Sequence, residues 1–338
     1  MPIHDPDAPA SVEDGIFGAE VDLQDAQVVL LPVPFDATVS YGHGAAYGPA
    51  AIKKASLQID LYDVELGSPW KSGIHWRDAP AWVMASSQRA RAFVERIHVH
   101  RESVSADHGE VHAASVAVNT YVEQEAERLI AAGKLVGVVG GDHSVPLGSI
   151  RAHARRHPGL GILHVDAHAD LRRAYEGFTY SHASIMERVT AEAADVARLV
   201  QVGLRDVSES EVDLIRGSNG RIQAYFDAEL ARARVEGRLL EVFRAVASEL
   251  PEQVYVSVDI DGLDPRFCPG TGTPVPGGLT FNELNLLLGE LVRSGRSVLG
   301  FDLCEVAPHE GDREWNGNVG ARVLYKLIGW AVISGTDH

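Results

Sequence analysis

The order of apolar and amphipathic segments in this 338-residue chain predicts a three-layer α/β/α domain with a mostly parallel central sheet. Short apolar runs alternate with longer segments in which apolar residues recur at helical spacing. Right-handed crossovers join such strands and helices, and they place helices on both faces of a parallel sheet. No internal repeat or low-complexity linker interrupts the alternation. We therefore expect a single domain over residues 26–338, preceded by a loose acidic tail or entry segment over residues 1–25.

The expected strands are short runs rich in valine, isoleucine and leucine. They cover residues 27–33, 134–140, 160–165, 198–204, 221–226, 253–258 and 297–303. The expected helices cover residues 109–134, 236–250, 281–295 and 318–334, and another begins in YGPAAIKKAS at 47–56. Gly133, Pro251 and Gly295 provide stop signals for three of them. Segment 62–108 predicts a helix only in its second half, SSQRARAFVERIHVH.

The composition limits the classes of protein and partner. The formal net charge is −17, so nucleic acid, whose phosphates bind lysine and arginine, is not an expected partner. An acidic protein favours a cationic substrate by steering, although acidity also serves solubility alone. No run approaches the roughly 20 apolar residues of a membrane helix, and the N-terminus lacks a signal-peptide pattern. The two cysteines, Cys268 and Cys304, form no disulfide framework, so we expect a reducing, cytoplasmic location.

Polar side chains follow one expected strand at every second position. In ILHVDAHADL, residues 162–171, Asp166, His168 and Asp170 come directly after the apolar run. Alternate residues of an extended chain point the same way, so the three side chains share one face. Taken alone, this pattern is also compatible with a solvated turn.

Three further apolar runs end in similar clusters. These are GGDHS with His143, DIDGLDP with Asp259 and Asp261, and the glutamate Glu305 after SVLGFDLC. The carboxyl ends of parallel strands share one edge of the sheet, and that edge carries the ligand crevice in open α/β sheets. We therefore expect the four clusters to converge in space.

The combined side chains are typical of a site for two divalent ions. They are two imidazoles and four carboxylates: His143, Asp166, His168, Asp170, Asp259 and Asp261. Six ligands are too many for one zinc ion with an open position, whereas shared carboxylates suit two ions. Oxygen-rich ligation favours a harder metal such as Mn²⁺, with Ni²⁺, Co²⁺ or Fe²⁺ as alternatives. Two such ions make a bridging water a nucleophile near neutral pH.

These motifs resemble those of a known family. GGDHS, DAHAD and SVDIDGLDP, in this order, are similar to the three metal motifs of the ureohydrolases, which include arginase and agmatinase. The resemblance extends from about residue 27 to the C-terminus. It implies an arginase-like α/β/α domain, a dimanganese site, hydrolysis of a guanidino group to urea and an amine, and a homotrimer or homohexamer.

The resemblance also implies a role for each motif residue. One ion would be bound by His143, Asp166, Asp170 and Asp259, and the other by His168, Asp166, Asp259 and Asp261. Asp170 would hydrogen-bond the attacking hydroxide and transfer its proton to the leaving amine. Glu305 would pair with the substrate guanidinium, and His182, in YSHAS, would be a proton shuttle.

Two departures from arginase point to the substrate. Where arginases carry an asparagine and an aspartate that hold the amino acid, this chain has Arg172 and Ser208. We therefore expect these two as substrate-binding positions and agmatine, rather than free arginine, as the substrate, with putrescine and urea as products. Segments 64–76 and 309–322 also depart from the agmatinase pattern, so guanidinobutyrate, guanidine and arginine remain alternatives.

Some residues and two other functions stay open. Trp70, Trp76 and Trp315 either reshape the pocket or pack at a core edge. His43, in the glycine-rich YGHG, is a candidate for the pocket mouth. The other functions are an amide hydrolase on the related deacetylase-type fold, which uses one zinc ion, and a non-catalytic metal-binding homologue. The complete ligand set argues against both.

Overall fold

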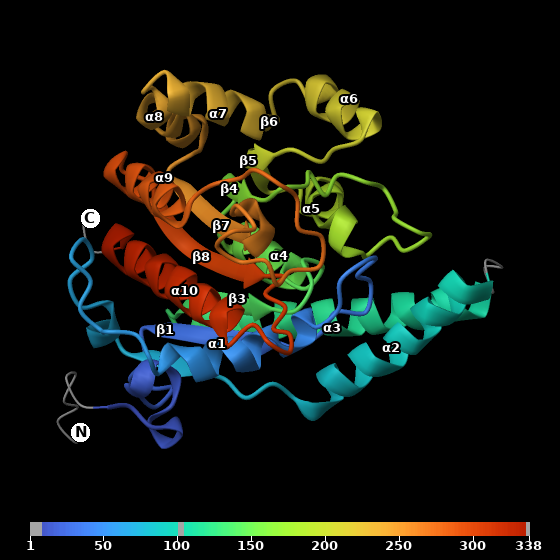
Figure 1. The fold of residues 1–338 in the computed structure, drawn as a ribbon, viewed down its shortest axis with the longest axis horizontal. Helices are drawn as coiled ribbons and strands as arrows, with labels where there is room; N and C mark the ends of the chain where they lie inside the picture. The colour runs from blue at the N-terminus through green and yellow to red at the C-terminus, as the bar shows by residue number, and fades with distance from the viewer. Residues whose placement is uncertain (1–8, 101–104, 336–338) are drawn as a thin grey trace.

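One sheet of eight parallel strands forms the centre of the computed structural model, which describes residues 9–100 and 105–335 (Figure 1). The order along the sheet is β2-β1-β3-β8-β7-β4-β5-β6. The strands are β1 (Val28–Val33), β2 (Ile74–Trp76), β3 (Leu135–Gly140), β4 (Leu160–Val165), β5 (Val196–Leu204), β6 (Ile222–Phe226), β7 (Gln253–Asp259) and β8 (Ser297–Cys304). The fold class predicted from the sequence is confirmed.

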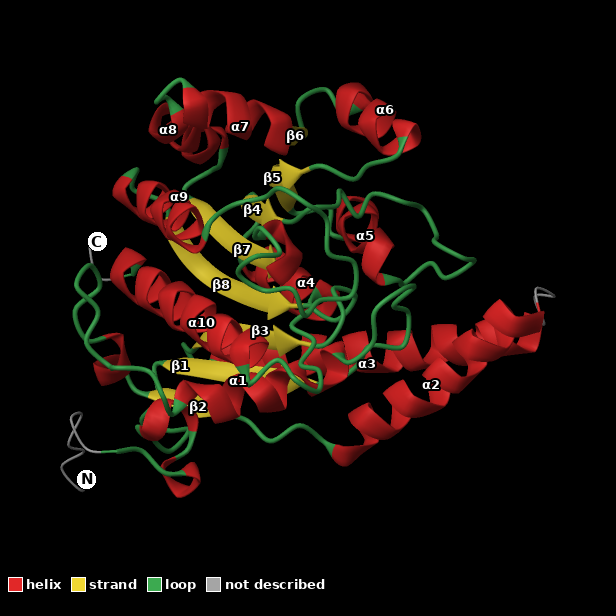
Figure 2. Cartoon of the chain, in the orientation of Figure 1, coloured by secondary structure: helices red, strands yellow, loops and turns green. Residues whose placement is uncertain are grey.

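Helices cover both faces of the sheet, as Figure 2 shows. On one face a shared apolar core joins the sheet to α1 (Gly48–Ser56), α8 (Leu239–Glu249), α9 (Phe281–Arg293) and α10 (Trp315–Ser334). On the opposite face lie α2 (Ala81–His100), α3 (Ser105–Ala131), α4 (Leu147–Arg156) and α5 (Ile185–Glu192). Short helices α6 (Glu209–Gly217) and α7 (Asp227–Val235) pack at the β5–β6 end. Within the described residues, no helix has the length and apolarity to cross a bilayer.

The expected strands are all present, with boundaries that differ by two residues at most. The sequence did not reveal β2, a three-residue edge strand that pairs with β1. Helices α4 to α7 are eight to ten residues long, too short for a clear periodic pattern. Segment 62–108, in which the sequence predicts a helix only in the second half, contains β2 and the whole of α2.

The strand order brings the four polar motifs together. Strands β3, β8, β7 and β4 are consecutive in the sheet, so the chain leaves all four at the same edge. Val258 of β7 is in register with Val165 of β4 on one side and with Leu303 of β8 on the other. The residues that follow these positions are therefore neighbours in space, although His143 and Glu305 are 162 residues apart in the chain.

The glycine pair of GGDHS is required by close packing at this edge. A Cβ atom on Gly141 would lie 2.0 Å from the carbonyl oxygen of Phe35. A Cβ atom on Gly140 would lie 2.4 Å from the Sγ of Cys304. The chain can turn at the end of β3, between β8 and the loop after β1, only because these two residues have no side chains.

The segment expected to be a loose tail or entry segment over residues 1–25 packs against the core in its second half. Ile16 and Phe17 are buried in the core beside α1 and α10. The backbone N–H of Phe17 donates to the Oγ of Ser56 at 2.9 Å, and its ring centroid lies 4.9 Å from that of Tyr325. The acidic composition of the segment gave no indication that these two apolar residues are buried. Residues 1–8 lie outside the described part of the chain.

Truncation of Phe17 tests this packing. Phe17→Ala is expected to lower the free energy of unfolding by about 3–5 kcal/mol, because it leaves a cavity between α1 and α10. Val12→Ala is the matched control, since Val12 is 79% exposed and should change stability by less than about 0.5 kcal/mol. Chemical denaturation measures both. Equal stability of the two variants would mean that the segment contributes nothing to the core.

Candidate active site

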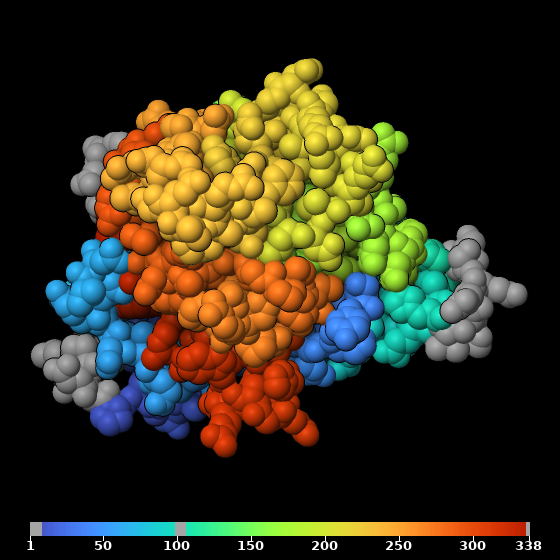
Figure 3. Space-filling view, turned by 45° about the horizontal axis from the view of Figure 1, so that its top comes forward, coloured from blue at the N-terminus to red at the C-terminus, as the bar shows by residue number. Residues whose placement is uncertain are grey.

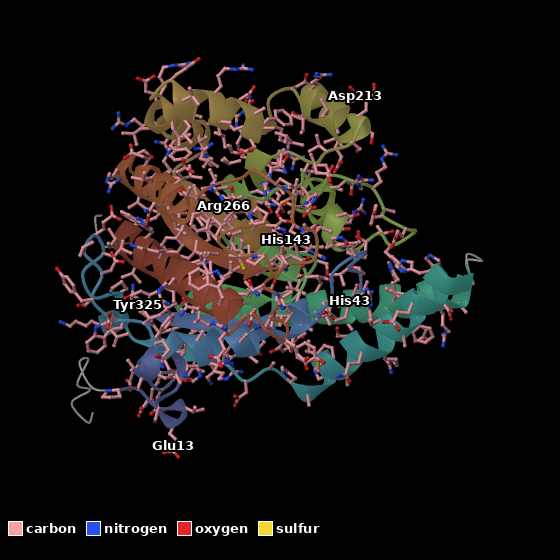
Figure 4. All side chains as sticks on the ribbon, in the orientation of Figure 1. Glu13, His43, His143, Asp213, Arg266 and Tyr325 are labelled. Atoms are coloured by element: carbon pink, nitrogen blue, oxygen red, sulfur yellow. The ribbon has the colours of Figure 1, made fainter. Side chains whose placement is uncertain are left out.

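His143 lies at the centre of the converging motifs, well inside the molecule (Figure 4). Its Nδ1 atom faces three carboxylates from two other strand ends. The distances are 3.1 Å to Asp166, 3.3 Å to Asp170 and 3.5 Å to Asp259. One imidazole nitrogen and three carboxylate oxygens around one point are a set that can bind a divalent ion.

A second group of ligands lies beside the first and shares Asp166 with it. The Nδ1 atom of His168 lies 3.1 Å from Asp261 and 3.4 Å from the Oδ1 of Asp166. The other oxygen of Asp166, Oδ2, is the one that faces His143. The two oxygens of one carboxylate therefore point to two different groups, which is the arrangement a bridging ligand needs.

Backbone amides hold the carboxylates in place. The N–H of His168 donates to Asp166 at 2.6 Å, and the N–H of Asp261 donates to Asp259 at 2.8 Å. Asp261 in turn accepts from the N–H of Ala167 at 3.0 Å. Asp170 has a φ of 54°, a left-handed conformation rare outside glycine, which turns its side chain back toward His143.

Residues behind the ligands orient them, and the sequence analysis did not identify these residues. The Nε2 atom of His143 lies 2.9 Å from the Oγ of Ser257, which donates to Asp302 at 3.0 Å. This contact places the proton on Nε2 and leaves the Nδ1 lone pair for a metal. His164 similarly contacts Asp166 at 2.9 Å. Ser257 and His164 each precede a motif aspartate by two residues. This spacing places them on the same face of the strand as that aspartate, and it is the sequence pattern that could have indicated them.

The charges of the cluster favour the binding of cations. Burial and neighbouring carboxylates raise the pKa of Asp170 to about 6, and they raise the pKa values of Asp259 and Asp261 above the ordinary range. Although burial opposes it, hydrogen bonds to Asp166 and Asp261 raise the pKa of His168 to about 12. Four ionised carboxylates beside two neutral imidazoles carry four negative charges, which two divalent ions match. The donor set therefore fits a dinuclear metal centre.

Glu305 and His182 lie next to this cluster. Glu305, with a φ of 65°, accepts the N–H of His143 at 3.0 Å through Oε1, while its buried Oε2 has no hydrogen-bond partner among the described residues. The backbone N–H of His182 donates to the Oγ1 of Thr38 at 3.2 Å. Burial, with a contribution from His168, lowers the pKa of His182 to about 4, so its imidazole is neutral at pH 7.

A cavity of about 280 Å³ opens from the cluster to solvent. Its lining residues are Ser40, Tyr41, His168, Asp170, Arg172, Tyr175, His182, Ala183, Asp206, Glu211, Thr273, Pro274 and Val275. Figure 3 shows the segment around residues 38–44, in blue, beside the orange segment around 270–276. The N–H of Gly42 donates to the carbonyl of Gly272 at 2.8 Å, which joins these two segments.

The two positions expected to select the substrate differ in placement. Arg172 lines the cavity, with its guanidinium 5.0 Å from the ring of Tyr175 and 3.8 Å from Glu211. Ser208 instead caps α6, where its Oγ donates to Glu211 at 2.7 Å, and it does not line the cavity described here. Its contact with a substrate stays a prediction. Glu211, which no sequence pattern indicated, lines the cavity between Arg172 and Ser208.

The residues left open by the sequence lie around this centre. His43 contacts Arg91 at 3.0 Å beside the loop that carries Tyr41, and it does not line the cavity. Trp76 is buried in the core, and Trp315 donates from Nε1 to the carbonyl of Phe267 at 2.7 Å. Trp76 is therefore a core residue, whereas Trp315 is half exposed and neither lines the cavity.

Comparison with known proteins agrees with this geometry. A model of the arginase family matches residues 26–329. The chain belongs to the arginase family. An N(1)-aminopropylagmatine ureohydrolase of Thermus thermophilus is 35% identical over 87% of each chain. The guanidinobutyrase of Pseudomonas aeruginosa is 31% identical over 92% of this chain and 87% of that one. The agmatine ureohydrolase structure of Thermoplasma volcanium matches with a TM-score of 0.72 over 94% of each chain at 23% identity.

This membership establishes the class of reaction. As an arginase-family member, the protein is a hydrolase that acts on guanidino groups. The family is one of binuclear metal enzymes, and the buried histidine and aspartate groups around His143 and Asp166 are compatible with metal binding. The sequence-based assignment to the ureohydrolases is confirmed.

Metal stabilisation should depend on pH through Asp170. Its folded-state pKa of about 6 is above the unfolded value of about 3.9, so the metal-free fold binds this proton more tightly than the unfolded chain does. Stability of the metal-free protein therefore falls as pH rises from about 4 through 6, where the carboxylate ionises among like charges. Bound Mn²⁺ removes that penalty and requires deprotonated ligands.

The expected result is a larger Mn²⁺-induced increase in Tm at about pH 7.5 than at about pH 5. Calorimetry on chelator-treated protein, with and without added metal, measures it. An increase of the same size at both pH values would contradict the electrostatic account of the cluster.

Proposed function

We propose that the protein hydrolyses the guanidino group of an alkylguanidine that carries an amine, releasing urea and the amine. Agmatine, which gives putrescine, and its N1-aminopropyl derivative are the preferred candidates. The observation that supports this most directly is Asp166, whose two oxygens face His143 and His168, beside the unpartnered oxygen of Glu305. Relatives named agmatinase and N(1)-aminopropylagmatine ureohydrolase support the substrate class.

The proposed ligand sets follow the two groups of side chains. One ion is assigned to His143, Asp166, Asp170 and Asp259, and the other to His168, Asp166, Asp259 and Asp261. Mn²⁺ is the proposed metal, with Ni²⁺ or another divalent ion as the alternative. The ions supply positive charge that acidifies water and makes it a nucleophile at neutral pH.

Three side chains would carry out the remaining steps. Glu305 accepts hydrogen bonds from the guanidinium through its free oxygen and holds the carbon in front of the attacking water. Water adds to that carbon, and the bond between the carbon and the alkyl nitrogen breaks. Asp170 takes one proton from the water and returns it to the leaving nitrogen, and neutral His182 transfers the second water proton, released as the added hydroxyl becomes the carbonyl of urea, to the amine, which leaves as an ammonium ion.

A second candidate substrate is 4-guanidinobutyrate. Arg172 lines the cavity and offers a cation to a carboxylate tail. Glu211, however, lies 3.8 Å from Arg172 and already compensates its charge, which favours an amine tail. Free arginine is disfavoured because the Ser208 hydroxyl is engaged by Glu211 in the cap of α6.

The cellular setting is proposed on the same basis. Both cysteines, Cys268 and Cys304, are free and buried, which agrees with a reducing cytoplasm. A homotrimer or homohexamer is the proposed assembly, by analogy with the family. The proposed partner is a small cationic guanidino substrate rather than nucleic acid or a membrane, in line with the net charge of −17.

Removal of a shared ligand tests the dinuclear assignment. Asp259→Ala is expected to reduce bound metal below one ion per chain and to lower kcat by at least about 10³-fold, because both ions lose a ligand. Elemental analysis after gel filtration measures metal, and urea release measures turnover. Persistent urea release by metal-depleted Asp259→Ala protein would contradict the mechanism.

The role of Glu305 is tested with an isosteric change. Glu305→Gln is expected to raise KM and to lower kcat/KM by roughly 10²-fold or more, since the guanidinium loses its anionic partner. Bound metal should be unchanged, because Glu305 is outside the proposed ligand sets. Loss of metal in this variant would assign Glu305 to the metal centre instead.

A substrate panel tests the specificity. Mn²⁺-loaded protein is given equal concentrations of agmatine, N1-aminopropylagmatine, arginine, 4-guanidinobutyrate and guanidine, and urea is measured. The two amine-tailed compounds are expected to react fastest. Preference for 4-guanidinobutyrate would favour the Arg172 interpretation. If no compound reacts, the panel is repeated with Ni²⁺, and a second failure would reject the proposed substrates.

A further inference from the structure

The charged groups at the rim of the cavity are unequally compensated. Glu211 accepts hydrogen bonds from the N–H of Leu171 and from the N–H and Oγ of Ser208, at 2.7 to 3.1 Å. It also faces the Nε of Arg172 at 3.8 Å, and the same guanidinium lies over the ring of Tyr175. The Arg172–Glu211 pair therefore contributes no net charge to the rim.

Asp206 is the carboxylate that remains. Its side chain is 71% exposed, and within the described residues no lysine or arginine lies within 4.0 Å of it. Its nearest cationic group is the Nε2 of His168 at 4.0 Å, and the Nδ1 of that ring already faces Asp166 and Asp261. An uncompensated negative charge therefore lies on the rim, beside the proposed metal ligand His168.

The position of this carboxylate is fixed by the backbone. The N–H of Asp206 donates to the carbonyl of Ala167 at 3.1 Å, and Asp206 pairs with His168 in a parallel bridge. The adjacent Arg205 donates to the carbonyls of Asp261 and Val275, at 2.6 and 3.0 Å. These bonds join the rim, the metal loop and the opposite wall, so the distance from the metal centre to the rim is built into the fold.

The rest of the path suits an alkyl chain that ends in a cation. Pro274 and Val275 provide an apolar wall for methylene groups. Tyr41 lines the mouth of the cavity with its ring 80% exposed, on a loop that the Gly42 contact and Arg91 fix in place. The ring of Tyr175 already accommodates the guanidinium of Arg172, so the rim is suited to cation–π contacts.

We propose that Asp206 and the ring of Tyr41 bind the terminal ammonium group of the substrate, so that the enzyme selects alkylguanidines whose chains end in ammonium groups. This inference rests on the proposed guanidino hydrolysis. It identifies the part of the site that binds the end of the alkyl chain opposite the guanidino group. Coulomb attraction to Asp206 supplies selectivity for charge. The aromatic ring of Tyr41 supplies a second contact farther from the metal centre.

The test compares two tails of equal size. Agmatine and pentylguanidine differ only in a terminal ammonium against a methyl group. Asp206→Asn is expected to raise KM for agmatine about 3- to 5-fold, the effect of one exposed ion pair, and to leave KM for pentylguanidine, kcat and bound metal unchanged. Asp206→Lys is expected to lower the preference for agmatine over 4-guanidinobutyrate by at least about 10-fold, because it reverses the charge.

Tyr41→Ala is expected to raise KM about 2- to 5-fold for agmatine and N1-aminopropylagmatine and to leave pentylguanidine less affected. Asp213→Asn and Tyr62→Ala are the matched controls. Asp213 lies at the periphery on α6 (Figure 4), Tyr62 is 69% exposed, and neither lines the cavity. Both control variants should match the wild-type protein with every substrate.

A contrary outcome is equally distinct. If Asp206→Asn impairs agmatine and pentylguanidine equally and loses metal, Asp206 acts only through His168, and the tail-binding role is overturned. Calorimetric binding of the same compounds to metal-loaded protein is measured alongside turnover. Failure of every compound to react would reject the proposed function. The binding data would still test the ammonium subsite. Weaker binding of agmatine alone by Asp206→Asn would support it, and unchanged binding would reject it.

Discussion

The structure depends on the burial of four carboxylates at one edge of the sheet. Placing Asp166, Asp170, Asp259 and Asp261 together in a low-dielectric environment is unfavourable, and the raised pKa of Asp170 to about 6 reflects that cost. Backbone N–H donors and the imidazole of His143 offset part of it. Bound divalent cations would offset the remainder, so the repulsion among the carboxylates favours the metal binding proposed for this site.

The surrounding fold meets the geometric demands of this cluster. The consecutive order β3-β8-β7-β4 places four strand ends side by side, and the Gly140–Gly141 pair permits the turn that presents His143. Left-handed backbone at Asp170 and Glu305 turns two carboxylates inward. These two residues are neither glycine nor asparagine, so their conformations are sustained by the contacts they make, a pattern typical of functional sites.

The strands could be predicted from the sequence, and the candidate metal ligands could be proposed from it, because both depend on local patterns. Apolar runs mark buried strands, and the period of two places Asp166, His168 and Asp170 on one face. Residues whose role arises from pairing between distant segments were missed. Asp302 meets Ser257 only because β7 and β8 are neighbours, and no local pattern encodes that choice. The packing of Ile16 and Phe17 could not be predicted from the average composition of the N-terminal segment, because their burial depends on α1 and α10.

The division of labour between strand ends and loops has an evolutionary consequence. The proposed metal ligands follow strands of the central sheet, where a change of spacing would disturb the core. The cavity rim comes from separate loops, around residues 40–41, 172–175, 206–211 and 273–275. Under the proposed function, substitutions there would alter the tail that is recognised without moving the reacting carbon. A lineage built on this scaffold can therefore exchange one guanidino compound for another by drift in its loops, while the chemistry stays constant.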